Sequence, residues 1–226
     1  MQVDEDTRIN VKLKTGQETE VNAQGPNVTD AQFQSLLNQI KETTDNDTVI
    51  VAGSVPKSIP SDAYAQIAKI TKQTGAQLVV DAEKDLVESV LEYQPLFIKP
   101  NKDELEVMFN TSVKSDEDVI KYAKQILDKG AQSVIVSLGG DGAIYVDRQQ
   151  SIKAVNPKGK VINTVGSGDS TVAGMVAGLA TGLSVQDAFK QAVASGTATA
   201  FDADLATKDA IENIKSQVTI SVLDGE

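Results

Sequence analysis

One short run of residues in the C-terminal third has the composition of an anion-binding site. Gly166, Ser167, Gly168 and Asp169 precede small and apolar residues at 170–179, a pattern typical of a helix. Glycines let the backbone approach a ligand closely, and the N–H groups at a helix N-terminus attract anions. Asp169 would accept a proton from a substrate hydroxyl. For such a run alone, a plain turn with Asp169 as the helix cap is the commoner explanation.

A second glycine-rich run follows a short apolar segment at 134–136. It contains Ser137, Gly139 and Gly142, and loops that follow the strands of an open α/β sheet often bind ligands. Neither GKS/T nor GxGxxG is present. A glycine-rich hairpin turn explains this run equally well when it is taken alone. Together with the first run, it predicts a second loop that faces a phosphate or nucleotide.

Lys99, Asn101 and Glu104 follow another apolar segment, at 96–98. Asn101 and Glu104 have the spacing of a helix capping box. The same two side chains could hold Mg²⁺ through water molecules, which this ion retains readily. On spacing alone capping is favoured over metal binding, although one pair can serve both purposes.

Arg8 is the lone arginine in the first 140 residues. It lies in a segment, 7–14, where apolar and polar residues alternate, and a turn at 15–16 leads to 19–22. This pattern predicts a half-exposed hairpin. An arginine there could grip a phosphate, but a solvated surface charge is the commoner role.

Apolar runs and amphipathic segments alternate along the rest of the chain. We expect strands, buried on both faces of a largely parallel sheet, at 49–52, 78–80, 96–98 and 134–136. We expect helices at 30–43, 62–74 and 116–129 and a helical run from 168. A hairpin is predicted from 143–146 and 152–155. Strand–helix alternation at this spacing predicts an α/β fold.

Several small residues are expected to end or pack these helices. Thr29, Ser61 and Ser115 are the predicted N-caps, and Gly75 and Gly130 the predicted C-terminal glycines. Gly174, Gly178 and Gly182 recur every four residues, which predicts close packing of one helix face against the sheet.

The composition excludes several classes of chemistry. The chain has 226 residues, a formal charge of −11, no cysteine and no histidine. It therefore has no disulfide, thiolate nucleophile or imidazole base. Its acidity disfavours nucleic acid and anionic membranes as partners. The acidic, polar start is unlike a secretory signal, so we expect a cytoplasmic protein. Without repeats or linkers, the chain is not divided into independent domains.

Taken in order, these motifs resemble those of the PfkB (ribokinase-like) family of sugar kinases. Residues 164–170 resemble the family's C-terminal signature, 99–104 its Mg²⁺-associated NxxE element, and 137–142 its nucleotide loop. The resemblance implies a three-layer αβα sandwich with a mostly parallel sheet and a partial β lid. Residues 7–13 with Gly25 and Pro26 are most similar to the branch that phosphorylates fructose 1-phosphate, and kinases of tagatose 6-phosphate are the near neighbours.

The resemblance also implies roles for individual residues, with ATP and Mg²⁺ as cofactors and a phosphosugar as substrate. Asp169 would be the base and Gly166, Ser167 and Gly168 the anion hole, while Arg8 would bind the sugar's existing phosphate. The implied nucleotide contacts are Lys99, Asn101, Ser137, Gly139, Gly142, Ala194, Ser195 and Ala198. Asn101 and Glu104 would serve Mg²⁺. Lid strands can form dimer contacts in this family, so a homodimer is one arrangement that the resemblance allows.

Family members also carry an N-terminal segment with a Gly-Gly-Lys-Gly-x-Asn motif, which does not occur here. The resemblance therefore places a partial lid hairpin at 1–24 and an ATP-binding αβα core at 25–226. Two alternatives to a fructose 1-phosphate kinase stay open at this point. One is a tagatose-6-phosphate kinase, and the other is a nucleotide-binding fragment without kinase activity.

Overall fold

The computed structural model describes residues 3–15 and 17–223. Its strands are β1 (Asn10–Thr15), β2 (Gln17–Asn22), β3 (Thr48–Ala52), β4 (Gln77–Asp81), β5 (Phe97–Ile98), β6 (Ser133–Ser137), β7 (Ala143–Asp147), β8 (Ser151–Val155) and β9 (Thr219–Val222). Its α-helices are α1 (Asp30–Ile40), α2 (Ala63–Thr74), α3 (Lys84–Glu88), α4 (Lys102–Phe109), α5 (Asp116–Lys129), α6 (Ser167–Ala180), α7 (Val185–Ala200) and α8 (Lys208–Gln217). Two 3₁₀ helices, η1 (Leu91–Tyr93) and η2 (Gly139–Asp141), complete the described elements.

Seven strands form one sheet in the order β3-β4-β5-β6-β7-β8-β9. Strands β3 to β6 are parallel, with Val79 opposite Phe97, and the pairings from β6 to β9 are antiparallel. Because β3 to β6 are parallel, their carboxyl ends lie along one edge of the sheet. Residues at these four ends are thereby brought together from distant parts of the chain.

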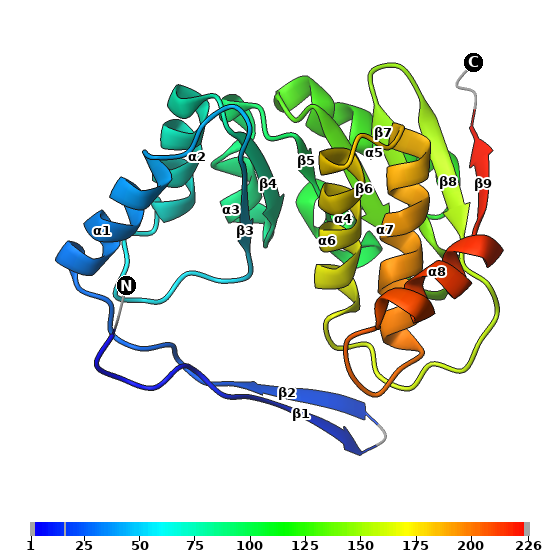
Figure 1. The fold of residues 1–226 in the computed structure, drawn as a ribbon, viewed down its shortest axis with the longest axis horizontal. Coiled ribbons are helices and arrows are strands. Elements are labelled where there is room, and N and C mark those ends of the chain that lie inside the picture. The colour runs from blue at the N-terminus through cyan, green and yellow to red at the C-terminus, as the bar shows by residue number, and fades with distance from the viewer. Residues whose placement is uncertain (1–2, 16, 224–226) are drawn as a thin grey trace.

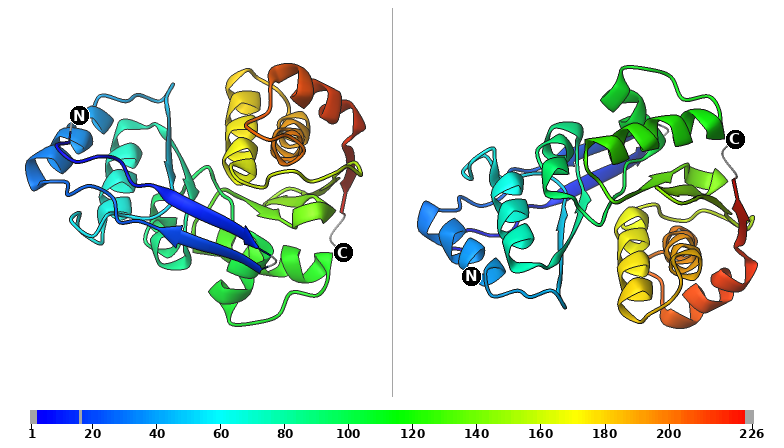
Figure 2. Two further views of the ribbon diagram at one scale, coloured as in Figure 1. Left: turned by 90° about the horizontal axis from the view of Figure 1, so that it is seen from below. Right: turned by 90° about the horizontal axis from the view of Figure 1, so that it is seen from above.

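Helices cover both faces of this sheet (Figures 1 and 2). Leu78 and Val80 of β4 pack in a core with residues of α2, α4 and α5, whereas Val79 between them packs in a second core with residues of α6, α7 and α8. This alternation follows from the opposite directions of successive side chains in a strand. The expected three-layer αβα arrangement is confirmed.

The expected burial of the parallel strands is confirmed for β4, β5 and β6 but is wrong for β3. Val79, Val80, Phe97, Ile98 and Val134 are all fully buried. By contrast, Ile50 of β3 is 45% exposed, while Val49 and Val51 face the helices. Strand β3 is one of the two edge strands of the sheet, and the core formed with α6, α7 and α8 does not include it.

The helices begin and end close to the expected residues. Thr29 forms a capping box with Gln32, and the hydroxyl of Ser115 accepts from the N–H of Asp118. The cap expected at Ser61 is wrong, because α2 starts after Asp62 and has no side-chain cap hydrogen bond. Gly75 follows α2 as expected, in the left-handed conformation that favours glycine there. Gly130 likewise follows α5 with a positive φ.

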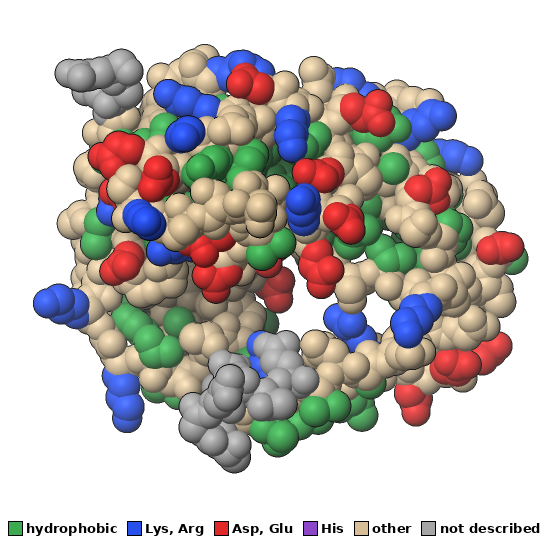
Figure 3. All heavy atoms as spheres, turned by 180° about the vertical axis from the view of Figure 1, so that it is seen from behind, with side chains coloured by type: hydrophobic (Ala, Val, Ile, Leu, Met, Phe, Trp, Pro, Cys, Tyr) green, Lys and Arg blue, Asp and Glu red, His purple; other side chains and the backbone are tan. Residues whose placement is uncertain are grey.

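The N-terminal hairpin is a separate two-stranded sheet, with Val11 of β1 opposite Val21 of β2. It extends along the lower side of the molecule in Figure 1, and the view from behind in Figure 3 shows a hollow between it and the core. The turn residue Gly16 lies outside the described residues. The division into a lid at 1–24 and a core at 25–226 stays a prediction.

None of the helices in residues 3–15 and 17–223 is long and apolar enough to cross a membrane.

The glycines of α6 pack against α7, which corrects the expectation that they meet the sheet. A Cβ on Gly174 would lie 2.9 Å from the Cα of Ala192, and one on Gly178 would lie 2.8 Å from the Cα of Ala188. Gly182 lies beyond the end of α6, where its φ is +79°. Gly174 and Gly178 therefore allow two helix backbones to approach closely.

We predict that Gly178→Ala destabilises the protein. Alanine normally stabilises a helix relative to glycine by roughly 0.5–1 kcal/mol, but overpacking a close contact costs about 1–3 kcal/mol. The expected net loss in the free energy of unfolding is about 1–2 kcal/mol, measured by urea denaturation. Ala177→Ser, at an exposed position of the same helix, is the control with little effect. A gain in stability for Gly178→Ala would contradict the packing argument.

Candidate active site

The loop before α6 places a glycine turn directly at a helix N-terminus. Gly166 is the N-cap residue with φ +79°, and α6 begins at Ser167. The N–H and hydroxyl of Ser167 both donate to the carbonyl of Thr164, at 3.2 and 2.8 Å. Of the expected anion hole, Gly168 is therefore best placed to offer its N–H, because the first turn of a helix lacks internal acceptors.

A buried lysine lies beside this helix N-terminus. Lys99, just after β5, is 7% exposed, and its Nζ is 3.1 Å from Oδ2 of Asp81 at the end of β4. A Cβ on Gly168 would lie 3.4 Å from the same Nζ. The absence of a side chain at Gly168 thus lets a cation approach the backbone at the start of α6. A positive charge and a helix N-terminus together favour a bound anion.

Opposing effects act on the pKa of Asp81. Burial raises the pKa of its carboxyl group, the ammonium group of Lys99 opposes that rise, and the negative charge of Asp169 adds to it. The carboxylate of Asp169 is therefore close enough to Asp81 to act on its pKa. Asp169 itself is exposed in the first turn of α6, so its carboxylate is accessible to a substrate.

Tyr64 of α2 fixes the loop that follows β3. Its hydroxyl donates to the carbonyl of Gly53 at 2.8 Å, and the N–H of Gly53 donates to the carbonyl of Asp81 at 2.9 Å. Burial, and next the negative charge of Asp81, raise the pKa of Tyr64 to about 12. The loop after β3 is thereby tied to the residue that pairs with Lys99.

Arg8 reaches this loop from the base of the hairpin. Its Nη1 donates to the hydroxyl of Ser54 at 3.0 Å. Both residues line a cleft of about 380 Å³ between the hairpin and the loop after β3. The other lining residues are Thr7, Asn22, Ala23, Gln24, Gly25, Pro26, Ala52, Val55, Pro56 and Lys57. The cleft therefore contains two cationic side chains, Arg8 and Lys57.

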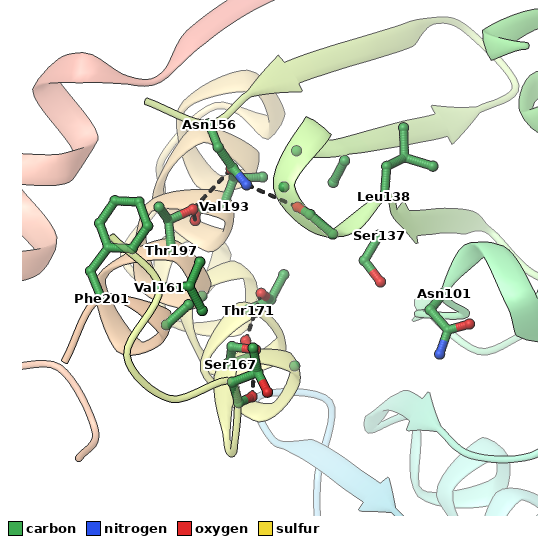
Figure 4. Close-up of a pocket in the computed structure, with 18 of the residues that line it drawn as sticks. Asn101, Ser137, Leu138, Asn156, Val161, Ser167, Thr171, Val193, Thr197 and Phe201 are labelled. Atoms are coloured by element: carbon green, nitrogen blue, oxygen red, sulfur yellow. Dashed lines mark hydrogen bonds between the residues drawn. The ribbon is translucent and has the colours of Figure 1, made fainter. Parts of the chain in front are cut away.

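A larger cleft, of about 860 Å³, lies between the turn after β6 and helices α6 and α7 (Figure 4). It is lined by Asn101, Lys102, Asp103, Ser137, Leu138, Gly139, Gly140, Gly142, Ala143, Asn156, Pro157, Lys158, Gly159, Val161, Thr164, Ser167, Gly168, Thr171, Val193, Gly196, Thr197, Ala200 and Phe201. One end of the cleft reaches Gly168, and the apolar side chains of Val193 and Phe201 come from α7 and the residue after it. Its size and mixed lining suit a small organic anion.

The structure brings four of the eight expected nucleotide contacts into this cleft, but neither Lys99 nor those of α7. Asn101, Ser137, Gly139 and Gly142 line it. Ala194, Ser195 and Ala198 are buried, and they do not line it. The cleft is lined instead by Val193, Gly196, Thr197 and Ala200. With 3.6 residues per turn, these four positions share one face of the helix, and the expected positions lie on another.

Asn101 and Glu104 form the expected capping box. The N–H of Asn101 donates to Oε2 of Glu104, and the N–H of Glu104 donates to Oδ1 of Asn101, each at 2.8 Å. In the described part of the chain no three His, Cys, Asp or Glu side chains are grouped closely enough to hold a metal ion. The capping box uses only Oε2 of Glu104, so the other carboxylate oxygen remains for a cation. With so few protein oxygens, the pair suits a cation that keeps most of its water.

Sequence reasoning missed the pairing of Lys99 with Asp81, and it missed the wall that residues 156–161 contribute to the cleft. The first could have been suspected, since both residues end predicted strands. The second has no signal in the sequence, because Asn156, Pro157 and Lys158 read as an ordinary polar loop.

We predict that replacing Tyr64 by Phe changes the pH dependence of stability. The pKa of Tyr64 is higher in the folded protein than in the unfolded chain. The stabilisation that its neutral hydroxyl gives to the folded state is therefore complete below pH 10 and is lost as the pH rises toward 12. The stability difference between the wild-type protein and Tyr64→Phe should shrink by about 1.4 kcal/mol between pH 8 and pH 11. Urea unfolding at both pH values measures it. A constant difference would show that the hydroxyl is not held neutral by the fold.

Comparisons with known proteins agree with this architecture. A profile of the pfkB family carbohydrate kinases matches residues 1–209. The chain is 43% identical to the 1-phosphofructokinase of Bacillus subtilis, over 96% of this chain and 72% of that protein. It is 37% identical to a tagatose-6-phosphate kinase of Staphylococcus epidermidis, over 84% of this chain and 63% of the relative.

A solved structure is also closely similar. The crystal structure of a Staphylococcus aureus protein assigned as a phosphofructokinase superposes with a TM-score of 0.90 and 80% sequence identity, covering 99% of this chain and 73% of that one. With the sheet, the glycine turn at α6 and the family match in agreement, the chain belongs to the pfkB family of carbohydrate kinases.

Proposed function

We propose that the chain is an ATP-dependent phosphosugar kinase that transfers the γ-phosphoryl group of ATP to the 6-hydroxyl of fructose 1-phosphate, giving fructose 1,6-bisphosphate. The observation that carries this proposal is the position of Lys99, a buried cation 3.1 Å from Asp81, whose Nζ would lie 3.4 Å from a Cβ placed on Gly168 at the start of α6. Asp81 borders the loop of the smaller cleft, and Gly168 lines the larger one. The cation therefore lies between the two clefts.

The larger cleft is the proposed nucleotide site. Backbone at Gly139 and Gly142 lies on one wall, and Val193 and Phe201 offer an apolar surface for a base on the other. The phosphate end would lie at Gly168, where the helix N-terminus and Lys99 stabilise negative charge. In this proposal the α7 residues that line the cleft contact the nucleotide, in place of the expected Ala194, Ser195 and Ala198.

Asp169 is the proposed base. With neither histidine nor cysteine in the chain, its carboxylate is the accessible group beside the anion site. A carboxylate is a weak base, but in a loose phosphoryl-transfer transition state the hydroxyl proton leaves late. Asp169 therefore needs mainly to orient the hydroxyl and to accept its proton once the new bond has formed.

Mg²⁺ is the proposed metal, held through water by Glu104 and Asn101. When bound, the ion would neutralise charge on the phosphate oxygens of ATP. The capping box fixes both side chains at the start of α4, and Asn101 lines the nucleotide cleft. The protein's part is to hold these two groups in place.

The smaller cleft is the proposed site for the phosphate already on the sugar. Arg8 donates to Ser54 there, and Lys57 lines the same cleft. A guanidinium group suits a phosphate because it presents several donors in one plane. A cytoplasmic location and a homodimer formed through the hairpin also stay predictions of this proposal.

Two other functions remain to be separated by experiment. The first is phosphorylation of tagatose 6-phosphate, which the similarity to the S. epidermidis kinase favours. The second is nucleotide binding without transfer. We would measure ADP release from Mg-ATP by the purified chain with fructose 1-phosphate, with tagatose 6-phosphate and without sugar. Turnover that requires fructose 1-phosphate supports the proposal. Binding of ATP with no sugar-dependent turnover would support the second alternative.

Replacing Asp169 by Asn should abolish most of the transfer. We expect kcat to fall by about 10²–10⁴-fold, because the base is lost, while the affinity for ATP changes little. Asp187→Asn is a matched control, since Asp187 is also an exposed third residue of its helix, α7. Steady-state kinetics and equilibrium nucleotide binding give both quantities. Retained turnover in Asp169→Asn would remove Asp169 as the base.

Replacing Arg8 by Ala should weaken sugar binding more than nucleotide binding. The loss of a charged hydrogen-bond donor to phosphate is expected to raise the KM for the phosphosugar about 10- to 100-fold. Arg148→Ala is the control, because Arg148 pairs with Asp128 on the surface, 66% exposed. If the KM for the phosphosugar is unchanged in Arg8→Ala, Arg8 is a solvated surface charge.

A further inference from the structure

Asn156 follows β8 and connects the two walls of the larger cleft. We propose that Asn156 is a positioning residue that holds the Gly139 turn at a fixed distance from α7, and so preorganises the cleft for ATP. This inference rests on the proposed nucleotide site. None of the roles considered above for the glycine-rich motifs includes Asn156.

Two hydrogen bonds carry the inference, and both are visible in Figure 4. The side-chain Nδ2 of Asn156 donates to the carbonyl of Gly139 at 3.0 Å. The hydroxyl of Thr197 donates to Oδ1 of Asn156 at 2.9 Å. The carbonyl of Val193, 2.8 Å away, is a second acceptor for the same hydroxyl. One amide thus contacts the turn after β6 on one side and α7 on the other.

The turn needs such a support at one of its two ends. Gly142, with φ +97°, sits directly on the backbone of Ala154, so that a side chain there would overlap the Ala154 carbonyl. At the other end, a Cβ on Gly139 or Gly140 would meet no atom within 4 Å. Packing therefore fixes the Gly142 end. The Gly139 carbonyl accepts the N–H of Gly142 within the turn at 3.2 Å, and the hydrogen bond from Asn156 is what ties this end of the turn to α7.

An asparagine is chemically suited to this position. The link requires a donor toward a carbonyl and an acceptor toward a hydroxyl, and a side-chain amide provides both. Pro157 follows and restricts Asn156 to extended conformations, which limits where its side chain can reach. Both ends of the amide are engaged by protein groups, so Asn156 acts on the nucleotide through the walls that it holds.

The test compares Asn156→Ala and Asn156→Asp with the wild-type chain. For Asn156→Ala we expect the KM for ATP to rise about 5- to 10-fold, with kcat and the KM for the phosphosugar within about twofold of wild type. Asn156→Asp should be at least as impaired, since a carboxylate would face the Gly139 carbonyl. Asn38→Ala in α1 is the matched control, because Asn38 is an exposed asparagine bonded to Lys41.

Calorimetric binding of ATP without sugar supplies a second readout, so the inference is tested even if the chain turns over no phosphosugar. A 5- to 10-fold weaker Kd for ATP in Asn156→Ala, with an unchanged thermal midpoint, supports the inference. An unchanged Kd would overturn it, and so would a general loss in which kcat, both KM values and the midpoint all change together. If neither Asn156 variant folds, Thr197→Val breaks the same link from α7 and is judged by the same criteria.

Discussion

The buried ion pair of Lys99 and Asp81 is the interaction on which the site depends. It joins the ends of two neighbouring parallel strands and brings a cation against the first turn of α6. Removing one partner of a buried pair typically costs about 3–5 kcal/mol, because the other charge is left without compensation. The pair thus holds a positive charge in place beside the proposed phosphate site. It also connects the loop of the smaller cleft, through Gly53 and Asp81, with the start of α6 in the larger one.

The rest of the architecture serves this arrangement. Parallel pairing from β3 to β6 puts the ends of four strands at one edge, and the glycines of α6 let that helix lie close to α7. As a result the N-terminus of α6 and the wall formed by α7 have a fixed relation to each other. The hairpin then approaches the same edge with Arg8. Each part of the proposed reaction comes from a different segment, so the fold supplies the geometry and the motifs supply the chemistry.

The parts of this account that were predictable from the sequence are the local ones. The α/β pattern, the buried strands β4 to β6 and the glycine turn before α6 all follow from neighbouring residues, as does the capping box of Asn101 and Glu104. The parts that failed depend on tertiary contacts. Strand β3 has the composition of a buried strand yet lies at an edge.

The face of α7 toward the cleft could not be chosen without its neighbours, which is why the expected residues Ala194, Ser195 and Ala198 do not lie among those that line it. The pairing of Lys99 with Asp81 likewise could not be predicted without knowing the order of strands in the sheet.

The most direct test of the central claim is a ³¹P NMR spectrum of the purified chain with Mg-ATP and fructose 1-phosphate. The account predicts a second sugar phosphate ester that grows in step with ADP. Consumption of ATP to inorganic phosphate alone, or no new ester with any phosphosugar, would contradict it.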